Sequence, residues 1–264
     1  MNPVALQARI FDKIPDRILY TLLAWQYRSF EAELRHLGDY FPSAAAKTGT
    51  VVDVGAWWGP WTYWLSRKAD HVVTIEPVPH LAAYLRRVVA DNVDLVETAL
   101  SDHSGMTELF VPTGGSGSEG RSTVEPRVAS GDRSKVEVQL TLLDDLDLQD
   151  VAFVKIDVEG HEMPVLRGAE KTLTQQRPVV LIEIEQRGDA VVRDVFDHFT
   201  SLGYHGWFRY ERRWNPVAQF DLERHQLAAQ ATVEGRGYIA NSLLGTAKYV
   251  NNFVFRPEET PPGR

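Results

Sequence analysis

The chain has 264 residues, 44% of them hydrophobic, and no cysteine. This length can bury one substantial core, and the lack of cysteine excludes disulfides, cysteine-ligated zinc and a cysteine nucleophile. A net charge of -8 argues against binding to nucleic-acid backbones, and no apolar run reaches the roughly 18 residues of a membrane span. We therefore expect a cytoplasmic protein with no nucleic-acid partner and no membrane contact.

Apolar side chains recur at a helical period in the first part of the chain, between residues 14 and 37, and the pattern ends near Gly38. The stripe consists of Ile14, Ile18, Leu22, Tyr27, Phe30, Leu34 and Leu37. We predict an N-terminal helical extension, residues 1–47, that packs on the core, covers a ligand or pairs subunits.

Short β-branched runs alternate with amphipathic segments from residue 50 onward. This alternation is typical of a parallel sheet with crossover helices, so the sequence predicts an α/β fold. The predicted strands are residues 50–55, 72–76, 94–98, 151–157 and 178–185. The predicted helices are residues 60–68, 79–91, 163–174 and 189–201.

A Gly/Ser-rich insertion, residues 112–135, interrupts the alternation between the third and fourth predicted strands. Extended segments at residues 107–111 and 136–140 flank it. Its composition predicts mobility, and loops of this length inside a compact domain are usually lids or disordered segments. We expect a lid over the site that receives the substrate.

The predicted strands at residues 204–210 and 250–256 close the sheet, and a tail follows over residues 257–264. The first of these strands begins a cluster of arginine and aromatic residues. Such a mixture suits a structural or subunit interface, a carbohydrate pocket or, least, stacking on bases. Together with the N-terminal helix it favours a homodimer. The cluster comprises Trp207, Phe208, Arg209, Tyr210, Arg212, Arg213 and Trp214.

A glycine-containing turn after the first predicted strand is the first candidate site. The chain runs from Asp53 through Gly55 and Trp57 to Gly59 before the next helix, and Glu76 ends the following strand. A turn of this kind lets backbone and helix N-terminus approach a nucleotide-like ligand, and a carboxylate about 20 residues later can bind ribose hydroxyls. Two indoles in the turn would crowd a pyrophosphate, so the pattern favours S-adenosylmethionine over a dinucleotide.

An acidic turn after the fourth predicted strand is the second candidate site. It contains Asp157, Glu159 and His161, and the next strand carries Glu183 and Glu185 on one face. Open α/β sheets place ligands at these strand ends, and charges in apolar strands are costly unless they are paired, solvated or bound to a cation. We interpret the group as functional, although capping and strand-end solvation are the alternative.

Methyl transfer to an aliphatic hydroxyl would explain these residue types, because the hydroxyl proton must be removed. His161 is the predicted base and Glu159 its rival. Asp157 and Glu183 are the predicted ligands of a divalent cation, Mg²⁺, that would orient the hydroxyl and lower its pKa.

Several stretches together resemble the FkbM family of S-adenosylmethionine-dependent O-methyltransferases over about residues 48–256. The resemblance implies the class I methyltransferase fold, a Rossmann-like sheet of seven strands, mostly parallel with the last antiparallel, and helices on both faces. The stretches are Asp53-x-Gly55, Glu76-Pro77, Ala99-Leu100-Ser101-Asp102, Lys155-Ile156-Asp157-Val158-Glu159-Gly160-His161-Glu162 and Leu181-Ile182-Glu183.

The resemblance also implies roles for single residues. The turn from Asp53 to Gly59, with Gly55 and Trp57, would hold the methionine part of the cofactor, and Glu76 the ribose. Ser101 and Asp102 would contact the adenine. Metal-dependent macrolide-sugar O-methyltransferases, a related group, have a similar arrangement of Asp157, His161 and Glu183, although this chain has Val158 and Glu159 where that group has small residues.

The family resemblance implies a hydroxyl acceptor on a sugar or a macrolide. Four tryptophans near the first helix could stack on a pyranose or pack in the core. We expect a sugar or oligosaccharide, with a methylated mannoside precursor of an actinobacterial polysaccharide as the narrower hypothesis. A macrolide or polyketide hydroxyl is the alternative, and a non-catalytic cofactor-binding scaffold is the second. The tryptophans are Trp57, Trp58, Trp61 and Trp64.

Overall fold

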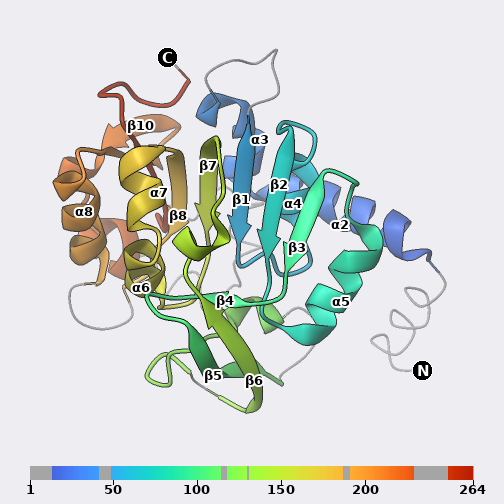
Figure 1. Ribbon diagram of the computed structural model, residues 1–264. Helices are drawn as coiled ribbons and strands as arrows, with labels where there is room; N and C mark the ends of the chain where they lie inside the picture. The colour runs from blue at the N-terminus through green and yellow to red at the C-terminus, as the bar shows by residue number, and fades with distance from the viewer. Residues whose placement is uncertain are drawn as a thin grey trace.

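The computed structural model describes residues 14–41, 49–113, 118–129, 131–186, 191–228 and 249–263. The strands of its main sheet are β1 (Thr50–Val54), β2 (His71–Ile75), β3 (Val93–Val96), β7 (Val151–Ile156), β8 (Val179–Glu183), β9 (His205–Tyr210), β10 (Arg213–Pro216) and β11 (Asn252–Arg256). Within the described residues they form an eight-stranded sheet in the order β10-β9-β11-β8-β7-β1-β2-β3 (Figure 1). The five neighbouring strands β8, β7, β1, β2 and β3 run parallel to one another. Strand β11 is antiparallel to both of its neighbours, β8 and β9.

The predicted α/β fold with a mostly parallel sheet is confirmed, but the expectation of seven strands is wrong by one. The additional strand β10 turns back on β9 as an antiparallel hairpin. Glu211 and Arg212 form its turn with φ angles of 49° and 67°. Two residues with positive φ suit the right-handed twist of a hairpin, although neither residue is the usual glycine or asparagine.

Helices cover both faces of the sheet (Figure 1). One face packs against α6 (Glu162–Arg167), α7 (Glu170–Gln175) and α8 (Val191–Ser201), and the other against α2 (Asp16–Phe30), α4 (Pro60–Leu65) and α5 (Pro79–Val88). A further short helix, α3 (Ala32–Arg35), follows α2. No helix in the described part of the chain is long and apolar enough to cross a membrane.

The predicted helix 163–174 is two helices, α6 and α7, because the chain bends at Gly168 and Ala169. A Cβ on Gly168 would lie 2.0 Å from the carbonyl oxygen of Ser101, so the backbone passes too close for a side chain. Asp144 then accepts hydrogen bonds from the N–H groups of Lys171 and Thr172, both at 2.8 Å, and so satisfies donors at the start of α7.

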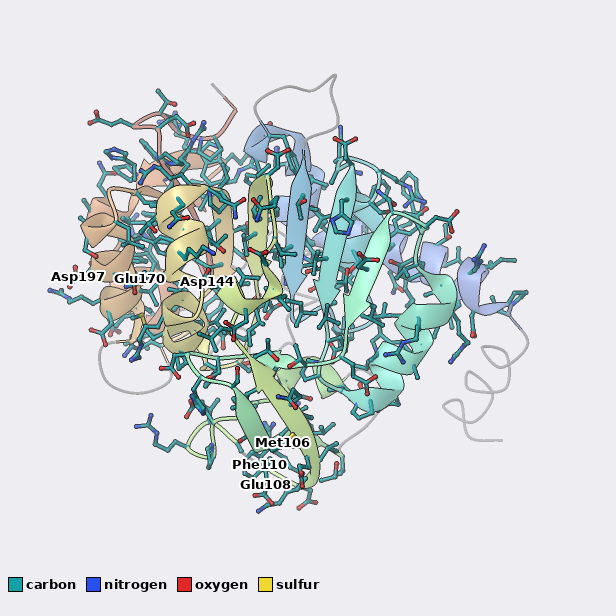
Figure 2. The ribbon with its side chains drawn as sticks, viewed as in Figure 1. Met106, Glu108, Phe110, Asp144, Glu170 and Asp197 are labelled. Carbon is teal, nitrogen blue, oxygen red and sulfur yellow. The ribbon has the colours of Figure 1, made fainter. Side chains whose placement is uncertain are left out.

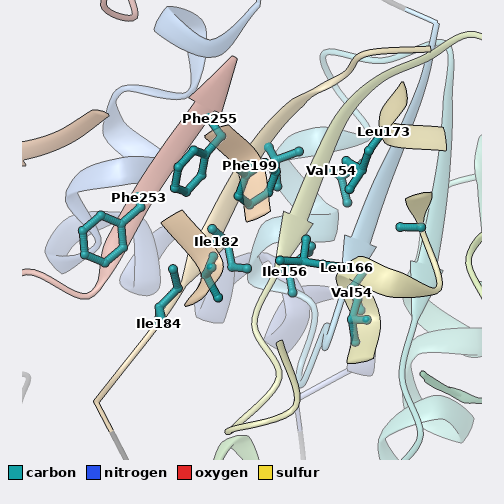
Figure 3. Close-up of a cluster of buried hydrophobic side chains, with 14 of the residues drawn as sticks. Val54, Val154, Ile156, Leu166, Leu173, Ile182, Ile184, Phe199, Phe253 and Phe255 are labelled. Carbon is teal, nitrogen blue, oxygen red and sulfur yellow. The ribbon is translucent and has the colours of Figure 1, made fainter. Parts of the chain in front are cut away.

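The core fills both faces because successive side chains of a strand point to opposite sides. Val52 and Val54 of β1 pack in the cluster beneath α6, α7 and α8, part of which is drawn in Figure 3, whereas Val51 packs beneath α2 and α4. In the first cluster the rings of Phe199 and Phe255 stack at 4.0 Å. Every residue of β1 is buried, and every residue except Asp53 is β-branched, as is typical of a strand that is covered on both faces.

The predicted apolar stripe of the N-terminal extension is only partly confirmed: Leu34 and Leu37 are buried and Tyr27 packs against the core, but the first turns of α2 use another face. Ile18 and Leu22 are each 53% exposed, whereas Tyr20 and Ala24 are buried. The ring of Tyr20 meets that of Tyr63 at 5.4 Å, with an edge-on geometry that aromatic pairs favour. The aromatic partners on α4 therefore decide which face of α2 is buried.

A small second sheet lies at the carboxyl ends of the main strands (Figure 1). It contains β4 (Ala99–Leu100), β5 (Gly105–Pro112) and β6 (Arg133–Thr141) in the order β4-β6-β5. Met106, Glu108 and Phe110 lie on its outer part (Figure 2), while Leu109 is buried. Between β5 and β6 the predicted insertion includes a 3₁₀ turn at Ser118–Arg121; its glycine-rich residues 114–117 lie outside the described residues.

Candidate active site

The register of the main sheet brings the predicted site residues to one edge. The last residue of β1, Val54, pairs with the last residues of both β2 and β7, and β7 pairs in register with β8. The residues that follow these strands, Gly55, Glu76 and Asp157, therefore lie side by side, next to Glu183 at the end of β8. Parallel sheets bind ligands at this edge.

The turn after β1 requires glycine at Gly55. Its φ angle is 78°, and a Cβ there would lie 1.9 Å from the carbonyl oxygen of Asp157. Trp57 has a φ of 54°, which is costly for a bulky side chain. Its backbone N–H donates to Oε2 of Glu76 at 2.7 Å, so Glu76 helps to hold the turn in this conformation.

The carboxylate of Glu76 is buried, with 3% of the residue exposed. Oε1 accepts a second backbone hydrogen bond, from Val78 at 2.8 Å. Burial raises the pKa of Glu76 to about 8, even though both N–H donors favour the ionised form. A carboxyl group that is buried but faces a cavity is well suited to accept hydrogen bonds from a ligand.

A cavity of about 660 Å³ lies at this edge of the sheet. Its volume falls within the range of small-molecule sites, about 300 to 1,000 Å³. One group of lining residues comes from the β1 and β2 turns and the β4 segment: Gly55, Trp57, Glu76, Thr98, Ala99 and Leu100. A second, mostly acidic group comes from α2, the ends of β7 and β8 and the segment before β11: Tyr27, Glu31, Asp157, Glu159, His161, Glu183, Glu185, Tyr249 and Asn251.

Asp53 lies beneath the turn and does not line the cavity. It is fully buried, and its Oδ2 accepts a hydrogen bond from Oγ1 of Thr62 at 2.6 Å. Burial raises the pKa of Asp53. Gly59, with a φ of 77°, precedes α4 and also lies outside the lining. Both residues shape the turn from below, and their contact with a ligand stays a prediction.

Replacing Thr62 by valine tests the support of Asp53. We expect the free energy of unfolding to fall by about 1–2 kcal/mol, because a buried carboxyl group loses a hydrogen-bond donor while the side-chain volume is kept. Urea denaturation measures the change. Thr107→Val, on the small sheet, is the control, and an equal loss in both variants would contradict the role of Thr62.

The predicted adenine contacts Ser101 and Asp102 do not line the cavity, although the preceding residues of β4 do. Ser101 is fully buried, and its Oγ lies 3.0 Å from Nε2 of His161. Asp102 pairs with Nδ1 of His103 at 2.8 Å and approaches Nε of Arg167 at 3.8 Å. The hydrogen bond from His103 lowers the pKa of Asp102.

The predicted metal ligands Asp157 and Glu183 both line the cavity, but each has a protein partner. Oδ2 of Asp157 accepts a hydrogen bond from Nζ of Lys155 at 3.0 Å, and Oε1 of Glu183 accepts one from Asn251 at 2.7 Å. Burial by itself lowers the pKa of Lys155, but Asp157 and Asp53 outweigh it and the net shift is upward. The buried ammonium group thus provides the positive charge that these carboxylates require.

These residues do not fit a metal centre. Within the described ranges, no group of three or more histidine, cysteine, aspartate or glutamate side chains is arranged to hold a metal ion. Burial, reinforced by Asp157 and Glu159, raises the pKa of Glu183 well above its usual value, which disfavours the ionised form that Mg²⁺ needs.

The predicted base His161 lines the cavity and is held on both ring nitrogens. Nδ1 lies 2.7 Å from Oε1 of Glu125, a residue of the insertion, and Nε2 faces Ser101. The rival base Glu159 lines the same cavity, and its carbonyl oxygen accepts a hydrogen bond from Oγ1 of Thr123 at 2.5 Å. The structure therefore brings both candidate bases to the acidic group of lining residues.

Sequence reasoning missed several residues that line the cavity or support it. Tyr27 belongs to the predicted apolar stripe. Glu31 follows it by one helical turn, and a charged residue beside an apolar stripe was the sequence signal that could have pointed to this part of the site. Burial raises the pKa of Glu31 well above its usual value. Asn251 and Glu125 carried no sequence signal, because only the folded chain brings them to the strand ends.

The tryptophans near the first helix and the arginine-rich aromatic cluster lie in different parts of the structure. Trp61 and Trp64 are buried in the core, and Nε1 of Trp64 donates to the carbonyl oxygen of Ala24 at 3.0 Å, so these two pack rather than stack on a ligand. Trp57 lines the cavity. The arginine-rich cluster forms the β9–β10 hairpin, and none of its described residues lines this cavity.

Comparison with known proteins adds a family match. A family model described as the methyltransferase FkbM domain matches residues 44–205. Among solved structures, the chain is similar to methyltransferase FkbM from Methylobacillus flagellatus KT, with 18% identity and a TM-score of 0.45 over 67% of this chain. The chain spans 45% of the length of that protein. No curated protein matches.

Two further solved structures have lower scores. Precorrin-6y C5,15-methyltransferase from Geobacter metallireducens GS-15 is 14% identical over 69% of this chain and 80% of its own, with a TM-score of 0.40. A TehB-like SAM-dependent methyltransferase from Corynebacterium glutamicum is 13% identical over 73% and 86%, with a TM-score of 0.38. These structural scores are low, and the family model, which matches more than half of the chain, is the finding that assigns it.

Proposed function

This chain belongs to the FkbM methyltransferase family, and we propose that it transfers the methyl group of S-adenosylmethionine to a hydroxyl of a sugar or oligosaccharide. The observation that carries the proposal is the cavity at the carboxyl edge of the sheet. There the Gly55 turn and Glu76 adjoin several carboxylates and His161. One group of residues suits an adenosyl ligand, and the other suits an acceptor with several hydroxyls.

Three residues of the chain fit the cofactor. Gly55 lets the backbone approach a ligand closely, and Glu76 offers a carboxylate to ribose hydroxyls. Nε1 of Trp57 is a buried donor without a hydrogen-bond partner among the described residues, so a ligand oxygen would satisfy it. When bound, the cofactor supplies an electrophilic methyl group.

The acidic group of lining residues indicates the class of acceptor. The carboxyl groups and the side-chain amide of Asn251 offer several hydrogen-bond partners to an acceptor that carries more than one hydroxyl group. The rings of Tyr27 and Trp57, with centroids 5.9 Å apart, provide apolar surface for the C–H face of a pyranose. A neutral sugar satisfies all of these features, with a mannoside as the narrower candidate.

His161 is the proposed base, with Glu159 as the rival. Nε2 of His161 takes the hydroxyl proton as the oxygen bonds to the methyl carbon and the bond from that carbon to sulfur breaks. For this step, the Ser101 hydroxyl that now contacts Nε2 must give way to the acceptor hydroxyl. Oδ1 of Asp102, 3.4 Å from Oγ of Ser101, offers the serine hydroxyl another acceptor.

Turnover should not require Mg²⁺, because Lys155 already neutralises Asp157 and the donor set for a metal is incomplete in the described residues. We expect the rate of methyl transfer to change by less than about twofold when EDTA is added to the purified protein. Abolition of activity by the chelator and its recovery with Mg²⁺ would instead restore Asp157 and Glu183 as ligands.

The proposed function is tested in two steps. Calorimetry first measures the binding of S-adenosylhomocysteine, and we expect 1:1 binding. Transfer of labelled methyl groups is then followed with neutral monosaccharides, partially methylated mannosides and macrolide aglycones. Transfer to a sugar hydroxyl supports the proposal; transfer to the macrolides alone overturns the acceptor class, and binding without transfer to any acceptor favours a scaffold. The predicted homodimer stays a prediction.

A further inference from the structure

The second part of the insertion is docked on the turn that carries the proposed base. Oγ1 of Thr123 donates to the carbonyl oxygen of Glu159, and the side chain of Val128 packs against Gly160 so closely that a Cβ there would lie 2.7 Å from it. Gly160 has a φ of 84°, so both its backbone conformation and the lack of space for a Cβ favour glycine at this position. This described part of the insertion therefore forms a wall of the site.

Glu125 of the same segment reaches the ring of His161. Oε1 lies 2.7 Å from Nδ1, and the side chains of His161 and Glu125 are only 12% and 22% exposed. A carboxylate can only accept a hydrogen bond, so Nδ1 must carry the proton and donate it. In the neutral ring Nε2 is then the basic nitrogen.

The two residues differ in their access to a substrate. His161 lines the cavity, whereas Glu125 contacts the ring of His161 and is not among the residues that line the cavity. The other charged groups around the ring are Glu159 and Glu162 on its own turn and Asp102, which is reached through Ser101. Oε1 of Glu162 accepts the N–H of Gly160 at 3.0 Å, and Asp102 pairs with His103. Glu125 thus bonds directly to the imidazole, at Nδ1.

On the basis of the proposed function, we propose that Glu125 is a positioning residue for the base. It holds His161 in the tautomer with Nδ1 protonated, which leaves Nε2, now in contact with Ser101 at 3.0 Å, as the nitrogen that can accept a proton. The proton passes from the acceptor hydroxyl to Nε2, and the resulting imidazolium is stabilised by the carboxylate on Nδ1. A residue of the insertion therefore completes the catalytic group.

The tautomer can be measured without turnover. The full chain, labelled with ¹⁵N-histidine and saturated with S-adenosylhomocysteine, is studied by NMR, and the His161 signals are assigned by their loss in His161→Gln. We expect Nδ1 to carry the proton in the wild type. Glu125→Ala should move the proton toward Nε2, while Glu125→Gln, whose amide oxygen still accepts, should restore the wild-type tautomer.

Val128→Ala is the matched control, because it weakens the docking of the same segment without touching the ring. We expect this variant to keep the proton on Nδ1. A wild-type proton on Nε2, or a tautomer that does not respond to Glu125→Ala, would overturn the proposal. A shift of equal size in Val128→Ala would also overturn it, because docking rather than Glu125 would then set the tautomer.

Kinetics provide a second test. Glu125→Ala should lower kcat by about 10- to 100-fold and leave the KM of the acceptor within about twofold, because only the proton transfer is affected. In a His161→Ala background, Glu125→Ala should cause no further loss. An additive loss in the double variant would overturn the role through His161.

The two proposals fail in different ways. If the tautomer follows Glu125 but no acceptor is methylated, the proposed function fails and the positioning of His161 stands. If sugars are methylated but Glu125→Ala changes neither the tautomer nor kcat, the positioning role fails and the proposed function stands.

Discussion

His161→Ala should reduce the turnover number by about 100-fold or more and leave the affinity for S-adenosylhomocysteine nearly unchanged. The imidazole lines the acidic part of the cavity, where a hydroxyl proton must be accepted, and it belongs to the group of lining residues proposed for the acceptor rather than for the cofactor. Aliphatic hydroxyls hold their protons tightly, so loss of the base affects the chemical step. Single-turnover rates and calorimetry measure the two quantities separately.

His103→Ala is the control for this experiment. His103 is also a histidine bonded to a carboxylate, but its side chain is 66% exposed and it does not line the cavity. We expect turnover to stay within about twofold of the wild type. If His161→Ala keeps most of its activity, Glu159 becomes the base, and Glu159→Gln should then show the 100-fold loss, about 2.7 kcal/mol in the barrier.

Affinity for S-adenosylhomocysteine should rise with pH because of Glu76. Burial raises the pKa of this carboxyl group to about 8, so most molecules carry its proton at pH 7. Ribose hydroxyls donate to the ionised form, hence binding releases the proton. Below pH 8 the affinity should increase by up to about tenfold for each pH unit, and it should level off above pH 8. Calorimetry between pH 6 and 9 in buffers of different ionisation enthalpy measures both affinity and proton release.

Two variants separate the contributions of Glu76. In Glu76→Gln the amide cannot ionise, so the slope with pH should disappear. In Glu76→Ala the affinity at pH 8 should fall by about 1–3 kcal/mol, because the ligand loses a charge-assisted bond and the N–H of Trp57 loses its acceptor. A wild-type affinity that is flat across this pH range, or unchanged affinity in Glu76→Ala, would remove Glu76 from the cofactor site.

Much of the fold followed from local patterns. Mostly apolar, β-branched runs predicted β1, β2, β7 and β8, because strands buried on both faces need apolar side chains at most positions. The predicted stripe of α2 was wrong at Ile18 and Leu22 because α2 has apolar residues on more than one side. Tyr63 and Tyr84, from α4 and α5, are the partners that fix the orientation of Tyr20.

The candidate site was only partly readable in the same way. Gly55, Glu76, Asp157 and Glu183 follow apolar strands, and parallel pairing brings such strand ends together. The metal hypothesis treated Asp157 and Glu183 as carboxylates in need of a cation. Lys155 precedes Asp157 by two residues, but only the fold shows that its ammonium group is buried and bonded to that carboxylate.

The sequence by itself determined the fold class, the family resemblance and the residues at the ends of the parallel strands. These features depend on periodicity and on short contiguous motifs, which local backbone geometry translates directly into structure. Only the tertiary structure decided which side chains surround those strand ends. Glu31, Glu125 and Asn251 arrive from a helix, an insertion and the segment before the last strand, and long-range packing alone places them in or against one cavity.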